Sequence, residues 1–310
     1  MKDSAPNGAR ANDASSGDRL FVALQRCLPT HLLSRVVHWF MRLEIVWLKN
    51  LVIRRFMAGF GISLGEAMVE DPAQFKSFNE FFTRELKPGT RPQPADPRAL
   101  ASPVDGRIYQ LGPVENGRIF QAKGQSFDAT ELLGGDARSA TPFINGSFAT
   151  IYLAPHNYHR IHAPLDARLR EMIYVPGRLF SVNPATARAL PGLFARNERV
   201  ACLFDTQAGP MALVMVGALF VGSIETVWAG EITPPARSRV DMTVYPQTGG
   251  GAVSLARGAE LGRFNMGSTV ILLFGPQAVE WAGGLRPDMA VQMGQAIGRV
   301  VKQELWKWTG

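Results

Sequence analysis

The hydrophobic pattern of this chain changes near residue 100, and this change most constrains the fold. Residues 19–60 carry apolar side chains at helical spacing, with Pro29 dividing the segment in two. Beyond residue 100, short runs rich in β-branched and apolar residues alternate with Gly, Pro and Asn. The pattern predicts an α+β protein: N-terminal amphipathic helices followed by a β-rich domain of packed antiparallel or mixed sheets, with an open barrel as the variant.

Four segments follow from this pattern. We expect a disordered tail, amphipathic helices, a helix with a proline-rich linker, and a β-rich domain, over residues 1–18, 19–66, 67–100 and 101–310. With 310 residues and 46% hydrophobic side chains, the chain can bury a sizeable core and is not disordered as a whole. Its two cysteines, Cys27 and Cys202, exclude a disulfide scaffold. The tail lacks the apolar core of a signal peptide, so we expect no export.

The positive charge is concentrated in one segment. The net charge is +7, and residues 19–58 hold seven basic residues and a single acid, Glu44. Because the remainder is nearly neutral, we expect no nucleic-acid partner. Within the segment, four basic or titratable residues form a narrow polar stripe at helical spacing: Arg35, His38, Arg42 and Lys49. The cations recur too often for a membrane span, which leaves two alternatives: a helix on an anionic membrane surface, or one that covers the protein's own core.

Residues 74–87 are predicted to form a short helix. Ser77 and Glu80 fit a capping box, and Lys87-Pro88-Gly89 would end the helix.

Three of the five histidines lie within seven residues, at positions 156, 159 and 162. Flanking prolines disfavour a helix, and in a strand positions three apart point to opposite faces, so one metal ion could not bind all three rings. We therefore expect no metal site. Histidine is the natural general base near neutral pH, so at least one of these residues is expected to be catalytic.

A polar Gly267-Ser268 pair precedes a run apolar enough to be a buried strand. Gly-Ser also occurs at 146–147 and 222–223, so only this context distinguishes it. A buried serine needs a partner, and serine, histidine and an acid together form an activated hydroxyl. Asp105, in an Asp-Gly turn, together with His162 or His159 and Ser268, could form such a set; spacing alone leaves open whether they meet.

Several longer motifs occur in order, and together they resemble the bacterial phosphatidylserine decarboxylases of the membrane-associated, pyruvoyl-dependent type. The resemblance runs from about residue 20 to about residue 280. The motifs are FNEFF (78–82), SPVDG (102–106), YHRIH (158–162), YVPG (174–177), FSVN (180–183), NERV (197–200), VGSIE (221–225) and GST (267–269). The family often has Leu or Gly where this chain has Met266, a mild departure because the reacting atoms belong to Gly267 and Ser268.

The resemblance implies a proenzyme that cuts itself between Gly267 and Ser268. Asp105 would orient His162 and stabilise its positive charge, and His162 would take the proton of the Ser268 hydroxyl. That oxygen would attack the Gly267 carbonyl to form an ester. Elimination and hydrolysis would leave a pyruvoyl group at position 268, with chains 1–267 and 268–310 remaining together.

The resemblance also implies the reaction: decarboxylation of phosphatidylserine to phosphatidylethanolamine in phospholipid synthesis. The pyruvoyl group would form a Schiff base with the serine amine and take up electrons as CO2 leaves. His159 would contact the substrate carboxylate or deliver a proton, and Ser181 is a candidate headgroup donor. The expected location is peripheral, on the cytoplasmic face of the bacterial inner membrane, where phosphatidylserine is the partner; a homo-oligomer stays open.

Two other classes of protein would account for part of the sequence. A non-enzymatic membrane adaptor would use residues 19–60 as its anchor but leaves the histidine cluster unexplained. A serine hydrolase would use Ser268, His162 and Asp105 on an external ester, but the chain lacks the G-x-S-x-G motif.

Overall fold

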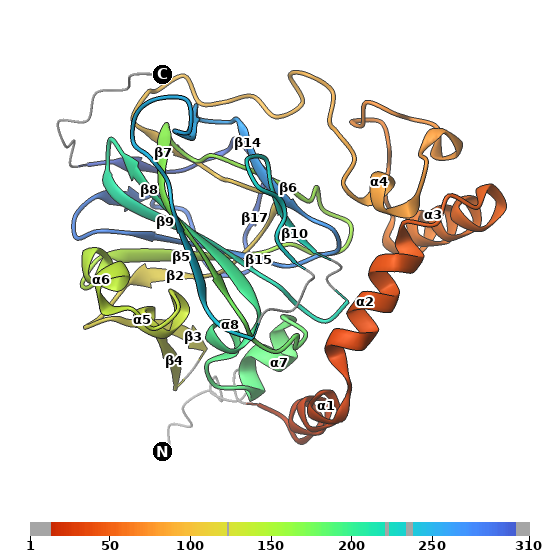
Figure 1. Ribbon diagram of the computed structural model, residues 1–310, viewed down its shortest axis with the longest axis horizontal. Helices are drawn as coiled ribbons and strands as arrows, with labels where there is room; N and C mark the ends of the chain where they lie inside the picture. The colour runs from red at the N-terminus through yellow and green to blue at the C-terminus, as the bar shows by residue number, and fades with distance from the viewer. Residues whose placement is uncertain (1–13, 123, 221–222, 234–237, 302–310) are drawn as a thin grey trace, which may run out of the picture.

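The computed structural model describes residues 14–122, 124–220, 223–233 and 238–301. Helices occupy the N-terminal part and antiparallel sheets the remainder, which confirms the α+β prediction. Figure 1 shows the first four helices as an arm along one side of the β-rich domain. We call residues 16–82 the helical arm. Its helices are α1 (Ser16–Cys27), α2 (Thr30–Met41), α3 (Val46–Phe60) and α4 (Phe78–Phe82), with the 3-10 helix η1 (Pro72–Gln74) before α4.

Local signals set the bounds of the long helices. Ser15 caps α1 in a capping box with Asp18, so helix begins three residues inside the segment expected to be disordered. The rest of that tail, residues 1–13, lies outside the described residues. Gly61 ends α3 in the left-handed conformation, with φ of 64°. No helix in the described part of the chain is long and apolar enough to cross a membrane.

The helix expected over residues 74–87 is shorter in the structure. Only α4 forms there, and Ser77 accepts from the Glu80 N–H at 3.2 Å. The Glu80 carboxylate accepts from Lys76 N–H instead of Ser77, so the capping box is only half made. The prediction of a longer helix was wrong because residues beyond α4 bend back toward the preceding loop, where Leu86 forms a bridge with Ala67.

One large antiparallel sheet organises the β-rich domain. Its nine strands follow the order β12-β7-β8-β9-β15-β5-β2-β17, and β13 also pairs with β7. The central strands β8, β9 and β15 are almost wholly buried, as expected for strands covered on both faces. The strands are β2 (Gly106–Pro113), β5 (Ser147–Tyr152), β7 (Ala167–Val175), β8 (Arg199–Thr206), β9 (Gly209–Val216), β12 (Asp241–Val244), β13 (Ser254–Leu255), β15 (Thr269–Phe274) and β17 (Ala290–Val291).

Smaller sheets and short helices cover the large sheet. One sheet has the order β1-β18-β16, a second β11-β10-β14-β6, and β3 pairs with β4. Their strands are β1 (Ala99–Ala101), β3 (Arg118–Ala122), β4 (Gln125–Asp128), β6 (Arg160–His162), β10 (Ile224–Thr226), β11 (Gly230–Glu231), β14 (Glu260–Phe264), β16 (Val279–Trp281) and β18 (Ala296–Val300). The short helices are α5 (Ala129–Leu132), α6 (Ala137–Ala140), η2 (Thr141–Phe143), α7 (Pro184–Ala189) and α8 (Leu193–Arg196).

Polar contacts attach the arm to the β-rich domain. Asp18 of α1 pairs with Arg188 of α7 at 3.1 Å. His38 of α2 and Arg42, which directly follows α2, both contact Glu231 of β11, at 2.8 and 2.6 Å. The arm therefore directs part of its basic surface inward.

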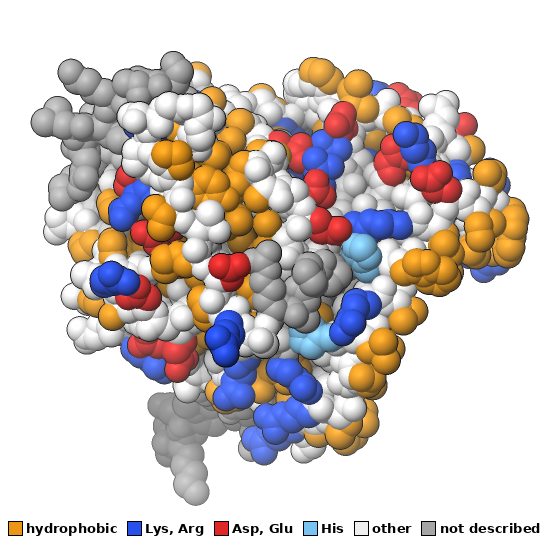
Figure 2. Space-filling view, in the orientation of Figure 1, with side chains coloured by type: hydrophobic (Ala, Val, Ile, Leu, Met, Phe, Trp, Pro, Cys, Tyr) orange, Lys and Arg blue, Asp and Glu red, His pale blue; other side chains and the backbone are white. Residues whose placement is uncertain are grey.

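The expected single polar stripe is interrupted, because α2 ends at Met41 and α3 begins at Val46. Lys49 of α3 is buried and donates to the carbonyl of Ala73 at 2.9 Å. Apolar side chains occupy the outer face instead, and Figure 2 shows them along the outer edge of the molecule. This outer apolar face comprises Leu20, Leu24, Leu32, Val36, Trp39, Val46, Trp47, Leu51 and Phe60.

Candidate active site

The Gly267-Ser268 pair lies between β14 and β15, at the end of the large sheet. Ser268 is fully buried, and its carbonyl accepts from Leu153 N–H at 2.8 Å. The expectation that Gly-Ser leads into a buried strand is confirmed, since every residue of β15 is buried. The Ser268 hydroxyl has no hydrogen-bond partner among the described residues. A buried, unsatisfied hydroxyl is uncommon and is a candidate for a reactive group.

The residues before this pair are held by the helical arm. Met266 adopts φ of 121°, which is strained for a residue with a side chain, and packs against the aromatic cluster of the arm. Asn265 accepts from the Asn79 amide of α4 at 3.0 Å and also bonds Ser223. Backbone strain therefore lies directly beside the Gly267-Ser268 bond, fixed by contacts from α4.

His159 is the histidine next to this bond. A Cβ added to Gly267 would lie 3.3 Å from His159 Nε2. His159 Nδ1 donates to the carbonyl of Asn157 at 2.8 Å, so Nε2 is the acceptor of the neutral ring. Burial, together with the charge of Arg84, lowers the pKa of His159 to about 3, which keeps the ring neutral. Within the described structure Nε2 has no hydrogen-bond partner.

His162 is held in a different environment. Its Nδ1 donates to the carbonyl of Gly258 at 2.8 Å, and its Nε2 accepts from the Tyr158 hydroxyl at 2.9 Å. Burial lowers the pKa of His162, while the nearby negative charges of Glu260 and Asp105 act to raise it. His162 is thus neutral at pH 7, with its two ring nitrogens already occupied.

Asp105 lies in the turn between β1 and β2, where it pairs with arginine. Its carboxylate accepts from Arg91 Nε at 3.0 Å and Nη2 at 2.7 Å, and from Met293 N–H at 2.8 Å. Among the hydrogen bonds of the described residues, none joins Asp105 to His162. The two residues are close enough to interact by charge, but Gly258 and Tyr158 orient the imidazole.

Ser181 reaches the same end of the large sheet. Asn197 donates to the carbonyl of the preceding residue and to that of Gly217, each at 2.8 Å, and Gly217 directly follows β9 beside Ser268. The Ser181 N–H donates to the Gln25 amide oxygen of α1 at 2.7 Å. The structure therefore brings Ser181 to this end, where the arm meets the β-rich domain.

Three residues of the site were missed in the sequence. Tyr158 bonds His162, Arg91 holds Asp105, and Arg84 contributes a buried positive charge near His159. Arg84 lies two residues after the FNEFF motif, and this proximity is the one sequence feature that could have pointed to a role in the site. Arg91 lies in the proline-rich linker, where nothing in the sequence indicated its partner.

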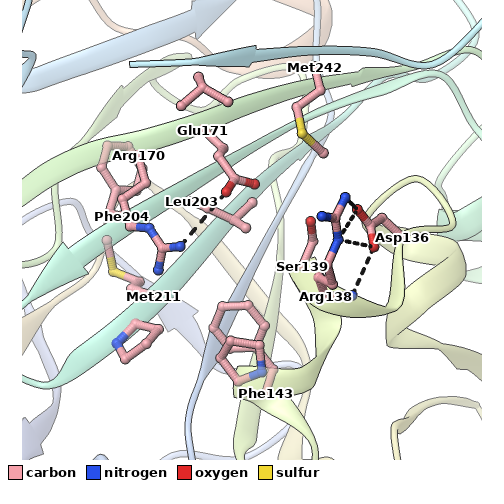
Figure 3. A pocket seen from close by; sticks show the side chains of 13 residues that line it. Asp136, Arg138, Ser139, Phe143, Arg170, Glu171, Leu203, Phe204, Met211 and Met242 are labelled. Atoms are coloured by element: carbon pink, nitrogen blue, oxygen red, sulfur yellow. Dashed lines mark hydrogen bonds and ion pairs between the residues drawn. The ribbon is translucent and has the colours of Figure 1, made fainter. Parts of the chain in front are cut away.

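A separate cavity of about 330 Å3 lies at the opposite end of the large sheet. Figure 3 shows its lining, in which Arg138 pairs with Asp136 at 2.8 Å and Arg170 approaches Glu171 at 3.8 Å. It reaches Met211, whereas the Ser268 end of β9 is Val216, about 17 Å along the strand. Because these charges are paired and the distance is long, this cavity is distinct from the candidate site. No cluster of three or more His, Cys, Asp or Glu residues suited to a metal occurs in the described ranges.

Comparison with known proteins gives one consistent result. A family model described as phosphatidylserine decarboxylase matches residues 78–299, and a model described as PSD matches residues 20–61. The chain is 56% identical over 280 residues to the phosphatidylserine decarboxylase proenzyme of Ectopseudomonas mendocina (strain ymp), covering 90% of this chain and 98% of that protein. It is 54% identical over 282 residues to the protein of the same name from Stutzerimonas stutzeri (strain A1501), covering 91% and 95%.

These matches define the class of the protein as a decarboxylase. The chain belongs to the phosphatidylserine decarboxylase family.

Proposed function

We propose that the chain is a proenzyme that cuts itself at Gly267-Ser268 and then decarboxylates phosphatidylserine to phosphatidylethanolamine. The observation that carries this proposal is the buried, unpartnered Ser268 hydroxyl beside a strained residue and a neutral histidine. A hydroxyl nucleophile beside a strained segment is what self-cleavage requires, and a neutral histidine at the same bond suits the later proton transfer to the substrate.

The proposed cleavage proceeds through an ester. The Ser268 oxygen attacks the Gly267 carbonyl carbon, and the Ser268 nitrogen leaves that carbon as an amine. Loss of the Cα proton then expels the Gly267 carboxylate and leaves dehydroalanine. Water converts this residue to a ketone and releases ammonia, so that position 268 ends as a pyruvoyl group at the start of residues 268–310.

His162 is proposed to accept the hydroxyl proton, and the negative charge of Asp105 stabilises the resulting cation. Their electrostatic interaction supports this role, because Asp105 acts to raise the pKa of His162 against burial. For this transfer, the hydrogen bond from the Tyr158 hydroxyl to His162 Nε2 would break, so that Nε2 can accept the proton. Arg91 donates to the Asp105 carboxylate and holds it in place.

The residues around position 268 fit a pyruvoyl group. When formed, it supplies an electrophilic carbonyl that binds the substrate amine and accepts the electrons left by CO2. His159 Nε2, unpartnered and next to Gly267, is placed to contact the substrate carboxylate and to return a proton to carbon. Burial of His159 and Ser268 excludes water from this point.

We also propose that the protein is peripheral, on the cytoplasmic face of the bacterial inner membrane. The outer apolar face of α1–α3 supports this location, since exposed apolar patches of this kind mark interaction sites. Exposed Arg19, Arg26, Arg54 and Arg55 flank that face and suit anionic lipid. Ser181, near the junction of α1 with the β-rich domain, would donate to the headgroup.

Intact mass spectrometry of the purified chain tests the proposal. Wild-type protein should separate into residues 1–267 and 268–310, the second beginning with pyruvoyl. Ser268→Ala should remain one intact chain, and Ser147→Ala is the matched control, because Ser147 also follows a glycine and opens a strand. Cleavage of the Ser268→Ala variant at the same bond would contradict the proposal. An intact wild-type chain labelled at Ser268 by a fluorophosphonate would favour a hydrolase instead.

A further inference from the structure

A cavity of about 280 Å3 opens between the helical arm and the β-rich domain. The loop after α3, residues 61–67, lines one side, and Asp105 and Tyr158 of the candidate site line the other. Two arginines, Arg84 and Arg91, also line it. The cavity therefore joins the exposed end of the arm to the residues around Asp105.

The two arginines differ in how their charges are compensated. Arg91 is bound by two carboxylates, Asp105 at 2.7 Å and Glu66 at 2.9 Å. Arg84 forms no ion pair within the part of the chain that the structure describes; its Nη2 donates to the His156 carbonyl at 3.3 Å. The Arg84 guanidinium also lies 5.5 Å from the centre of the Phe81 ring.

Arg84 is nonetheless more than nine-tenths buried, at 8% exposure, and its Nη1 has no hydrogen-bond partner among the described residues. Burial lowers the pKa of this arginine, because the charged guanidinium loses hydration in the protein interior. A buried cation is normally paired, because its lost hydration is otherwise uncompensated. A buried guanidinium that lines a cavity and has no carboxylate partner within the described ranges is thus suited to an incoming anion.

We propose that Arg84 binds an anionic oxygen group of the substrate headgroup, phosphate or carboxylate, as the lipid enters this cavity. The inference rests on the proposed function and adds a substrate-binding residue to it. The phosphatidylserine headgroup has two anionic groups and one ammonium, so its one excess negative charge could pair with an arginine that has no direct ion-pair partner among the described residues. The planar guanidinium fork matches either oxyanion.

The location of Arg84 agrees with this role. The positive charge of Arg84 is close enough to His159 to contribute to the lowered pKa of that histidine. His159 in turn lies beside Gly267. An anion held at Arg84 would therefore lie near the bond that becomes the reacting end of the small chain. The cavity opening toward the arm would admit the headgroup from the proposed membrane side.

Steady-state kinetics on self-processed enzyme, with phosphatidylserine in mixed micelles, test the proposal. Arg84→Gln should raise KM by about tenfold or more, the effect of losing a charge-assisted hydrogen bond, and Arg84→Lys should raise it less. Arg138→Gln removes an equal charge from an exposed position on the other cavity and should leave KM unchanged. Inhibition by phosphatidylethanolamine identifies the group: weakened inhibition in Arg84→Gln indicates phosphate, and unchanged inhibition indicates carboxylate.

A wild-type KM in Arg84→Gln, or a fall in kcat alone, would overturn the proposal. If Arg84→Gln does not process itself, a wild-type KM in Arg84→Lys has the same meaning. Failure of both variants to process would assign Arg84 a structural role and would also overturn it. These outcomes leave the proposed function intact, which would fail only if the wild-type chain itself neither cut itself nor released CO2.

Discussion

The helical arm and the β-rich domain use similar apolar side chains in opposite ways. All six residues of β15 are buried between β5 and β9. On α3, Trp47 is 70% exposed, and other large apolar residues lie along the same outer face. In the sheet, burial of apolar area stabilises the fold, whereas on the arm much of that area still contacts solvent. This difference is what supports the proposed contact of the arm with a membrane surface.

The inner face of the arm differs from its outer face, because its side chains are buried against the candidate site. The aromatic cluster of the arm consists of Phe75, Phe78, Phe81 and Phe82, which pack with the aliphatic residues Ile53, Leu64 and Ala67. Met266 packs against this cluster, and the Phe82 ring lies 4.1 Å from the His159 ring. One side of the arm thus packs against residues of the candidate site, while the other side is exposed.

The largest expected effect separates these two faces. Phe82→Ala should destabilise the protein by about 3–5 kcal/mol and impair self-cleavage, because it opens a void beside His159. Phe60→Ala, at a phenylalanine of the same arm that is 46% exposed, should cost less than about 1 kcal/mol. Urea unfolding in a Ser268→Ala background, which keeps the chain intact, measures both. Equal losses would show that the two faces do not differ.

The response to acid should distinguish the buried site from exposed parts of the same loop. The pKa of His159 is lowered to about 3 from an ordinary value of 6.5, so the unfolded chain binds a proton more readily. Its contribution to stability is complete above about pH 6.5 and is lost as pH falls toward 3, by up to about 1.4 kcal/mol per pH unit.

His159→Gln should therefore flatten the dependence of unfolding free energy on pH between 6.5 and 4. His156→Gln is the control, since His156 is exposed three residues away. Urea unfolding at several pH values measures both variants, again in the Ser268→Ala background. If the two variants follow the same curve as the parent, His159 does not titrate as its burial implies.

The smallest effect concerns the membrane. Trp47→Ser should weaken flotation with liposomes containing anionic lipid by about tenfold, because a large apolar side chain no longer enters the bilayer interface. Val244→Ser, at an equally exposed apolar residue on β12 of the other region, should bind as well as the parent. High salt should weaken binding of both proteins through the flanking arginines. Loss of binding in the Val244 variant alone would place the membrane contact on the β-rich domain.

Local sequence signals predicted much of the fold. Pro29 separates α1 from α2, and Gly267-Ser268 precedes a buried strand, as expected. These features depend on residues close together in the chain, where proline geometry and hydrophobic pattern act directly. The short helix predicted over residues 74–87 forms only at Phe78–Phe82, because Leu86 pairs with Ala67, nineteen positions earlier in the chain.

The sequence by itself determined the order of the elements, the family motifs and the candidate residues Asp105, His159, His162 and Ser268. Only the tertiary structure decided how they are partnered: Asp105 with Arg91, His162 with Tyr158, and His159 beside Gly267. The tertiary structure also turned part of the arm's polar stripe inward and left its apolar face outward. The physical reason is that hydrogen bonds and burial depend on distances between segments, which periodicity along the chain does not encode.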